Sequence, residues 1–117
     1  MDVIKTAIFD CWIIKPKVFK DDRGYFYESF HQERFQQLTK TLFSPIQDNE
    51  AFSTYGVIRG LHFQETPFAQ AKLVRALQGT ILDVAVDLRK DSPSYCKVVT
   101  QVLSQENKEQ LFVPKGC

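Results

Sequence analysis

The stretch KLVRALQGTILDVAVDL, residues 72–88, decides the predicted fold. Side chains of a strand alternate between its two faces, so residues 80–88 divide into an even-numbered apolar face and an odd-numbered face that carries two aspartates. The dipeptide at 78–79, Gln-Gly, precedes this run and is typical of a hairpin turn. We therefore expect residues 72–77 and 80–88 to form the two arms of a hairpin.

The rest of the chain repeats this pattern of short strand-forming runs separated by turns. Further strands are expected at residues 7–14, 18–19, 25–30, 61–64, 97–103 and 111–113. Asp21 to Gly24 is a turn signal that would join two of these strands in a hairpin, and residues 31–39 are the only expected helix. Many short strands with turns between them predict a single all-β domain over residues 1–117, a sandwich or barrel with one short helix.

Composition excludes several classes of function. With 15 basic and 14 acidic residues the net charge is +1, which provides no overall field for nucleic acid or anionic membrane. No apolar run approaches the roughly 20 residues that span a bilayer, and the N-terminus does not resemble a signal peptide. Three widely spaced cysteines are expected to be free thiols. We therefore expect a cytoplasmic chain that binds neither membranes nor nucleic acid.

His62 is the first candidate for chemistry, because an imidazole can act as a base near neutral pH. On a strand, Gly60, His62 and Gln64 would share one face, and the glycine would leave room for a ligand beside the histidine. The alternative is a half-buried histidine that is satisfied by a backbone carbonyl.

Lys72 is the second candidate, since a lysine next to a reacting carbonyl can stabilise negative charge on oxygen. Its alternative is a solvated surface lysine. Asp83 and Asp87 lie in an otherwise apolar strand, where an unpaired carboxylate is costly to bury. One of them is expected to pair with Lys72, Arg75 or His62, either for function or as a structural ion pair.

Polar residues elsewhere could hold a ligand. Arg23, Arg59 and Arg75 carry planar charged groups that suit phosphate, although each alone could be a surface residue. The run Gln47-Asp48-Asn49 offers donors and acceptors of the kind that read a sugar or a base, or forms a plain polar loop.

A metal site is not expected. The chain has only two histidines, His31 and His62, and Gln64 stands where a second inward histidine could follow His62.

These motifs, taken in order, resemble the dTDP-4-dehydrorhamnose 3,5-epimerase family. The matching segments are 22–30 (DRGYFYESF), 47–49 (QDN), 56–64 (GVIRGLHFQ), 69–75 (AQAKLVR), 83–89 (DVAVDLR), 92–93 (SP), 103–104 (LS), 106–107 (EN) and 113–116 (VPKG). The resemblance implies a cupin-type antiparallel β-barrel or jelly roll with one short helix. It also implies a cofactor-free, metal-free isomerase that inverts the carbons beside the C4 ketone of a dTDP-4-keto-6-deoxy sugar, in deoxysugar (dTDP-L-rhamnose-type) biosynthesis.

The resemblance also implies roles for individual residues. His62 would be the base and Lys72 would stabilise the enolate oxygen, with Asp83 and Gln64 in support. The residues that would bind the substrate are Arg23, Phe26, Glu28, Gln47, Asp48, Asn49 and Arg59. In the family the segment with Arg23 to Glu28 reaches into the partner's site, which implies a homodimer with strand exchange.

Family members continue beyond the Pro-Lys-Gly at 114–116 with a further histidine, a tyrosine general acid and the acidic partner of the base histidine. We therefore expect this chain, which ends at Cys117, to be a fragment with an incomplete barrel, or to have its strand edges covered by another chain. We also expect the activity of the chain alone to be impaired, because the base and the electrophile are present but the acid is not. Three alternatives remain open: an inactive or truncated nucleotide-sugar-binding or structural dimer module, an epimerase acting at one carbon only, and a metal-dependent cupin oxygenase.

Overall fold

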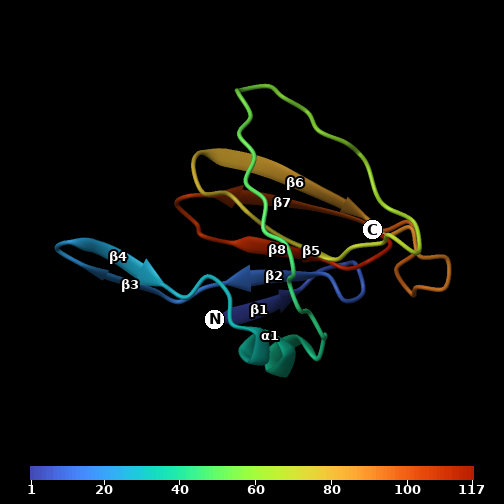
Figure 1. The fold of residues 1–117 in the computed structure, drawn as a ribbon, viewed down its shortest axis with the longest axis horizontal. Helices are drawn as coiled ribbons and strands as arrows, with labels where there is room; N and C mark the ends of the chain where they lie inside the picture. Colours follow the sequence, from blue (N-terminus) through green and yellow to red (C-terminus); the bar gives the residue numbers. More distant parts are fainter.

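The computed structural model describes residues 1–117 as eight strands and one helix (Figure 1). In chain order these are β1 (Asp2–Lys5), β2 (Trp12–Lys15), β3 (Val18–Asp21), β4 (Gly24–Tyr27), α1 (Gln32–Thr39), β5 (Lys72–Arg75), β6 (Thr80–Val86), β7 (Val98–Ser104) and β8 (Gln110–Val113). They form a four-stranded sheet of order β1-β2-β8-β5 and two separate hairpins, β3–β4 and β6–β7, with every pairing antiparallel. The predicted all-β fold with one short helix is therefore confirmed.

Strand β8 lies inside the four-stranded sheet and is covered on both faces. Its neighbours are β2, where Trp12 stands opposite Phe112, and β5, where Leu73 stands opposite Phe112. Leu111 and Phe112 are 0% and 1% exposed, although alternation sends them to opposite faces. A strand that is buried on both faces needs a second layer on each side.

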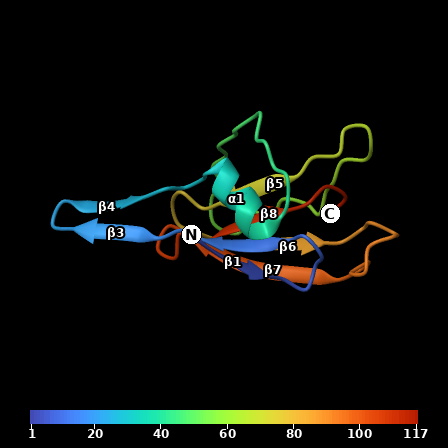
Figure 2. The same ribbon diagram turned by 90° about the horizontal axis from the view of Figure 1, so that it is seen from below.

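The helix provides the layer on one face. Phe35 of α1 is fully buried and its ring centre lies 5.0 Å from that of Phe112, within a cluster that also contains Trp12 and Ile14. His31 is the N-cap of α1, and its Nδ1 accepts a hydrogen bond from the backbone N–H of Arg34 (3.4 Å). Figure 2 shows the helix crossing the sheet on this side. The predicted helix is thus confirmed, and it is too short and too polar to cross a membrane.

The β6–β7 hairpin provides the layer on the other face. Ala85 of β6 and Val99 and Leu103 of β7 pack in one cluster with Leu111. The inward face of β6 is the odd-numbered one that carries the two aspartates, whereas Leu82 on the even-numbered face is 64% exposed. The more apolar face of this strand therefore points away from the core.

The β3–β4 hairpin projects from the body as an arm, residues 18–27 (Figure 1). Its turn at Asp21–Gly24 is the predicted one, with the Arg23 backbone N–H donating to Asp21 Oδ1 at 2.9 Å. The strand pairing ends at Tyr27, opposite Val18, which is shorter than the expected strand 25–30.

Three expectations about strands are wrong. Residues 7–14 are not one strand, because the chain turns between β1 and β2, where the Cys11 N–H donates to the Ile8 carbonyl at 3.1 Å, and β2 begins only at Trp12. Residues 72–77 and 80–88 do not pair, because β5 pairs with β8 and β6 pairs with β7. Gly79 has a left-handed backbone (φ 69°), but the turn at this residue joins the four-stranded sheet to the facing β6–β7 hairpin and does not close a hairpin. Val74 of β5 and Ala85 of β6 then pack against one shared core, which buries more apolar surface than an isolated hairpin would.

The expected strand at 61–64 is also absent, because no other strand runs beside it. The whole segment 41–71 contains no helix or strand, and only two backbone–backbone hydrogen bonds form within it. Its largely exposed apolar side chains are Leu42, Ile46, Phe52, Tyr55, Val57, Ile58, Leu61, Phe63 and Phe68. This long segment is held by its two ends, at α1 and at β5.

A buried carboxylate, Asp87, ties the loop after β6 together. Its side chain is fully buried and accepts hydrogen bonds from Arg89 Nε (2.8 Å), Ser92 Oγ (2.6 Å) and Ser94 Oγ (2.6 Å). Arg89 also donates to the Phe9 carbonyl at 2.7 Å, so the cluster joins this loop to the one between β1 and β2. The Arg89 guanidinium holds the pKa of Asp87 well below its usual range, since these bonds favour the ionised form.

We expect Asp87→Asn to lower the free energy of unfolding by about 3 kcal/mol at pH 7, as measured by urea denaturation, because it breaks a buried ion pair. A folded-state pKa below the unfolded value makes the stabilisation complete above about pH 4, and it is lost as pH falls through the folded pKa. The gap between variant and wild type should therefore narrow below pH 4. The exposed Asp91→Asn is the control, and an equal loss in both variants would contradict the role of the cluster.

Candidate functional site

Lys72 and Asp83 lie on two different layers, and their charges interact. Asp83 is half-buried, whereas Lys72 is exposed to solvent, as the alternative of a surface lysine expects. Lys72 opens β5, where it stands opposite Val113 and shares a face with Val74, which packs against the core. Asp83 precedes the buried Ala85 by two residues on β6 and so shares its inward face. Burial raises the pKa of Asp83, and a backbone hydrogen bond and the charge of Lys72 offset this only in part.

The carboxylate of Asp83 lacks a complete set of hydrogen bonds. Its Oδ2 atom is shielded from solvent and has no hydrogen-bond partner. Gln101 stands opposite Asp83 in the β6–β7 register, yet its Nε2 donates to Glu109 Oε2 (2.6 Å) instead. Glu109 is in turn paired with Lys15 at 2.7 Å. A buried, unsatisfied carboxylate is expensive, so this one calls for a functional explanation.

Sequence reasoning missed Gln101 and Glu109 as interior polar residues. The alternation in the predicted strand 97–103 contained the signal for the first, because Gln101 lies between Val99 and Leu103, both of which face the core. No pattern indicates Glu109, which enters through the turn between β7 and β8.

His62 lies in the segment 41–71 and is exposed to solvent. It makes no side-chain hydrogen bond, so the alternative of a histidine satisfied by a carbonyl is wrong. The expected shared face with Gly60 and Gln64 does not exist, since this stretch is not a strand. Gly60 nevertheless lies against the imidazole: a Cβ at Gly60 would come 3.1 Å from His62 Nδ1, and the backbone there has φ 108°.

The other candidate residues of this segment bond within it. Arg59 Nε donates to Ser53 Oγ (3.0 Å), and its Nη2 donates to the Phe52 carbonyl (3.0 Å). Gln47 Nε2 donates to Asn49 Oδ1 at 3.0 Å. Asp48 and Gln64 are exposed. The guanidinium of Arg59 thus braces its own loop.

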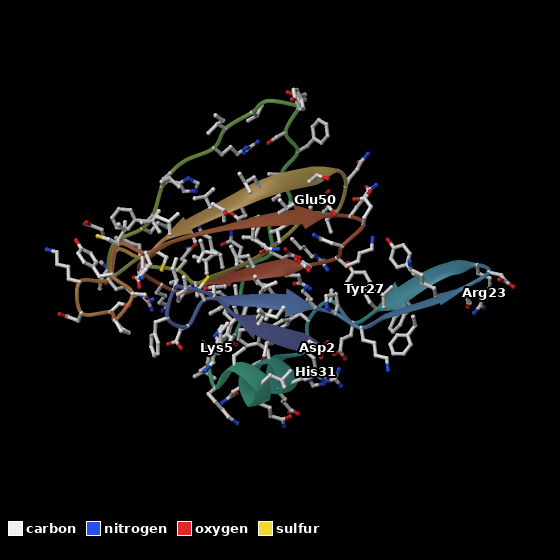
Figure 3. All side chains as sticks on the ribbon, turned by 180° about the vertical axis from the view of Figure 1, so that it is seen from behind. Asp2, Lys5, Arg23, Tyr27, His31 and Glu50 are labelled. Carbon is white, nitrogen blue, oxygen red and sulfur yellow. The ribbon has the colours of Figure 1, made fainter.

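The candidates on and beside the arm lie apart from that segment. Arg23 is paired with Asp21 at 2.7 Å, and Glu28 is paired with Arg34 at 2.6 Å. Phe26 is 71% exposed. Figure 3 shows Arg23 at the far tip of the arm and Glu50, next to the polar run 47–49, away from it over the body of the molecule. One chain therefore does not bring its two sets of candidate ligand-binding residues together.

No group of three or more His, Cys, Asp and Glu side chains lies close enough to hold a metal ion. His31 is engaged at the start of α1. The three cysteines form no disulfide. Among the candidate residues, Lys72 is an exposed cation whose charge interacts with the desolvated carboxylate of Asp83, and an ammonium group near a carbonyl can stabilise an oxyanion.

Comparison with known proteins gives consistent results. The family model for dTDP-4-dehydrorhamnose 3,5-epimerase matches residues 5–117. The enzyme of that name from Shigella flexneri is 53% identical over 116 residues, which are 99% of this chain and 64% of the relative.

Solved structures agree with this. The crystal structure of dTDP-4-dehydrorhamnose 3,5-epimerase from Elizabethkingia anophelis is 50% identical with a TM-score of 0.94, over 99% of this chain and 63% of that one. An epimerase from Legionella pneumophila in complex with dTDP-4-keto-L-rhamnose is 44% identical with a TM-score of 0.91, over 98% of this chain and 61% of that one.

The chain spans less than two thirds of the length of these relatives. The match nevertheless runs through both layers of the fold, the arm and the segment with His62, and the fold is the cupin-type one expected of these proteins. The chain belongs to the dTDP-4-dehydrorhamnose 3,5-epimerase family.

Proposed function

We propose that this chain carries the base and the electrophile of a sugar-nucleotide 3,5-epimerase. The reaction removes a proton from each carbon beside the C4 ketone of a dTDP-4-keto-6-deoxyhexose and returns it on the opposite face, in dTDP-L-rhamnose-type biosynthesis. The observation that carries the proposal is a desolvated carboxylate, Asp83, which lies close enough to the exposed cation Lys72 for their charges to interact. The Legionella relative that binds dTDP-4-keto-L-rhamnose supports the choice of substrate.

Lys72 and His62 have different roles in the proposed reaction. Loss of a proton next to a ketone leaves negative charge on the ketone oxygen, and the ammonium group of Lys72 would stabilise that charge. His62 takes the proton, since imidazole gains and loses protons near neutral pH. Gln64, two residues along the chain, supports the imidazole. The exposed position of His62 means that its segment must close over the interior when the sugar binds.

Asp83 supports Lys72. Its unpartnered Oδ2 is an acceptor that the rest of the protein leaves free, because Gln101 donates to Glu109. A carboxylate attracts a neighbouring ammonium group and so helps to hold it in place. The carboxylate is therefore a positioning group, and the enolate oxygen is the group that Lys72 contacts.

The nucleotide part is bound by two separate sets of residues. The first set is Arg23, Phe26 and Glu28 on and next to the arm, and the second is Gln47, Asp48, Asn49 and Arg59 in the long segment. Guanidinium groups suit the diphosphate, the phenyl ring offers a stacking surface and the amides can read the thymine edge.

A homodimer would bring these two sets together. Within one chain the tip of the arm is remote from the run 47–49, so the arm would serve the site of a second copy (Figure 3). The exposed Phe19 and Phe26 on one face of the arm and the apolar side chains of 41–71 provide the surface for this contact. Since the two cores share β8, we propose that each chain contributes a single domain, residues 1–117.

The proposed function is tested by incubating the chain with dTDP-4-keto-6-deoxyglucose in heavy water. We expect deuterium to be incorporated at C3 and C5 of the sugar, and NMR measures its rate of incorporation. His62→Asn and Lys72→Met should each lower the exchange rate by about 10²–10³, because a base or an oxyanion-stabilising group is removed. The exposed Lys90→Met is the matched control and should exchange like wild type.

Other outcomes distinguish the alternatives. Deuterium at one carbon only would identify a single-carbon epimerase. Binding of dTDP by calorimetry without any exchange would identify a non-catalytic binding module and would contradict the proposed function.

In the Asp83→Asn variant we expect the stability and the exchange rate to change in opposite directions. Because burial raises the pKa of Asp83 above its unfolded value, the stability present below about pH 4 is lost as pH rises through the folded pKa. The asparagine variant should therefore be more stable than wild type at pH 7 by urea denaturation, and this advantage should vanish near pH 4. Its exchange rate should fall, since Lys72 loses its partner. A loss of stability at pH 7, compared with the exposed control Asp2→Asn, would contradict this account.

A further inference from the structure

The arm that carries Phe26 is held to the body at few points. Its two strands pair only with each other. Within residues 18–27, Tyr25 is the one side chain that hydrogen-bonds outside the arm. A two-stranded hairpin of this length is marginally stable alone. The contact made by Tyr25 is therefore the one that can restrain the outer part of the arm.

Lys108 is the residue that grips Tyr25. Its Nζ donates to the Tyr25 hydroxyl at 3.1 Å and lies 4.2 Å from the centre of the ring, so one ammonium group makes both a hydrogen bond and a cation–π contact. The Tyr27 ring stacks on Tyr25 at 6.1 Å with an interplanar angle of 29°. The contact thus extends to the base of the arm, where Figure 3 places Tyr27.

The turn that carries Lys108, between β7 and β8, is braced by its neighbour. Asn107 Oδ1 accepts from the backbone N–H groups of Ser104 (3.0 Å) and Glu109 (2.9 Å), and Asn107 Nδ2 donates to the Val102 carbonyl (2.9 Å). The Lys108 N–H donates to the Ser104 carbonyl at 3.1 Å. Lys108 therefore projects from a rigid point of the body.

A second attachment restrains the chain where it returns from the arm. Gln110 is 1% exposed, and its Nε2 donates to the Ser29 carbonyl at 2.7 Å. Gln110 fixes the position of the arm's base, and Lys108 acts farther out, at Tyr25. Two attachments at different distances from the base fix the orientation of the arm, whereas a single attachment would let the arm rotate about it.

Because side chains alternate along a strand, the contact between Lys108 and Tyr25 also decides which face of the arm can bind a ligand. Tyr25 and Tyr27 lie on one face of β4, and Phe26 lies on the other, opposite Phe19 of β3. Lys108 holds the tyrosine face, so the phenylalanine face is the one that can meet a second copy and the nucleotide in its site. Phe26 and Phe19 are indeed exposed.

We propose that Lys108 is the positioning residue that sets the direction of the β3–β4 arm and thereby presents Phe26 and Arg23 to the nucleotide. The inference rests on the proposed function for the nature of the ligand, a thymidine diphosphate. The grip on the arm itself does not depend on it.

The test compares the wild-type chain with Lys108→Ala, Lys108→Arg and the matched control Lys97→Ala, an exposed lysine without a side-chain partner. Motion of the arm is measured by ¹⁵N relaxation of residues 18–27, and binding of dTDP is measured by calorimetry. In Lys108→Ala we expect the arm to gain nanosecond motion and dTDP to bind about fivefold more weakly. Lys108→Arg should resemble wild type, because a guanidinium can make both contacts.

Kinetics separates positioning from a general loss of structure. The substrate concentration for half-maximal deuterium exchange should rise in Lys108→Ala, while the exchange rate at saturation and the urea midpoint stay the same. Tyr25→Phe, which keeps the ring but loses the hydroxyl, should fall between Lys108→Ala and wild type.

Three results would overturn the proposal: an arm as ordered in Lys108→Ala as in wild type, a mobile arm with unchanged affinity for dTDP, or the same changes in Lys97→Ala. If wild type binds no dTDP, the proposed function fails. The relaxation data then decide alone whether Lys108 holds the arm.

Discussion

Pairing of β8 along both of its edges is the constraint on which the rest of the structure depends. Its four residues join β2 to β5 and send Leu111 into one core and Phe112 into the other. The same strand positions the functional groups. Val113 sets the register of Lys72, and the turn just before β8 carries Lys108. A slip of one residue would exchange the two faces and would move the core residues and the lysine together.

Local patterns in the sequence were enough to predict most elements but not their partners. The arm, the helix 31–39 and the strands near 80–88 and 97–103 follow from turn residues and alternation, which act over a few positions. The pairing of β5 with β8 joins residues 72–75 to 110–113, a choice made by the burial of two cores at once. The turn at Gly79 fits both a hairpin and a change of layer, so it could not decide between them. The isolated stretch 61–64 has strand-like residues, but a strand also needs a neighbour.

The two inward aspartates of β6 and its following loop show how far the candidate site could be predicted. Alternation placed Asp83 and Asp87 on one face, and the cost of burial predicted that one of them would pair with Lys72, Arg75 or His62. No such ion pair forms: Asp87 pairs with Arg89 instead. Asp87 is satisfied by Arg89, Ser92 and Ser94 and secures the fold. Asp83 keeps a free oxygen next to Lys72. The sequence alone could not show which aspartate would be fully hydrogen-bonded, because this depends on which side chains of other elements lie next to each carboxylate.

Contact with a second copy would explain both the exposed apolar side chains of this chain and the way in which the proposed site is completed. The arm and the segment 41–71 both show apolar side chains to solvent, and both carry residues that we propose bind the nucleotide. Apolar groups of this size favour contact with another surface. A second copy would cover them and would also bring Arg23 to the polar run 47–49, which one chain keeps apart (Figure 3). Burial of the exposed segment would exclude water around His62 and strengthen the effect of the Lys72 charge. Assembly and chemistry would then depend on the same contact.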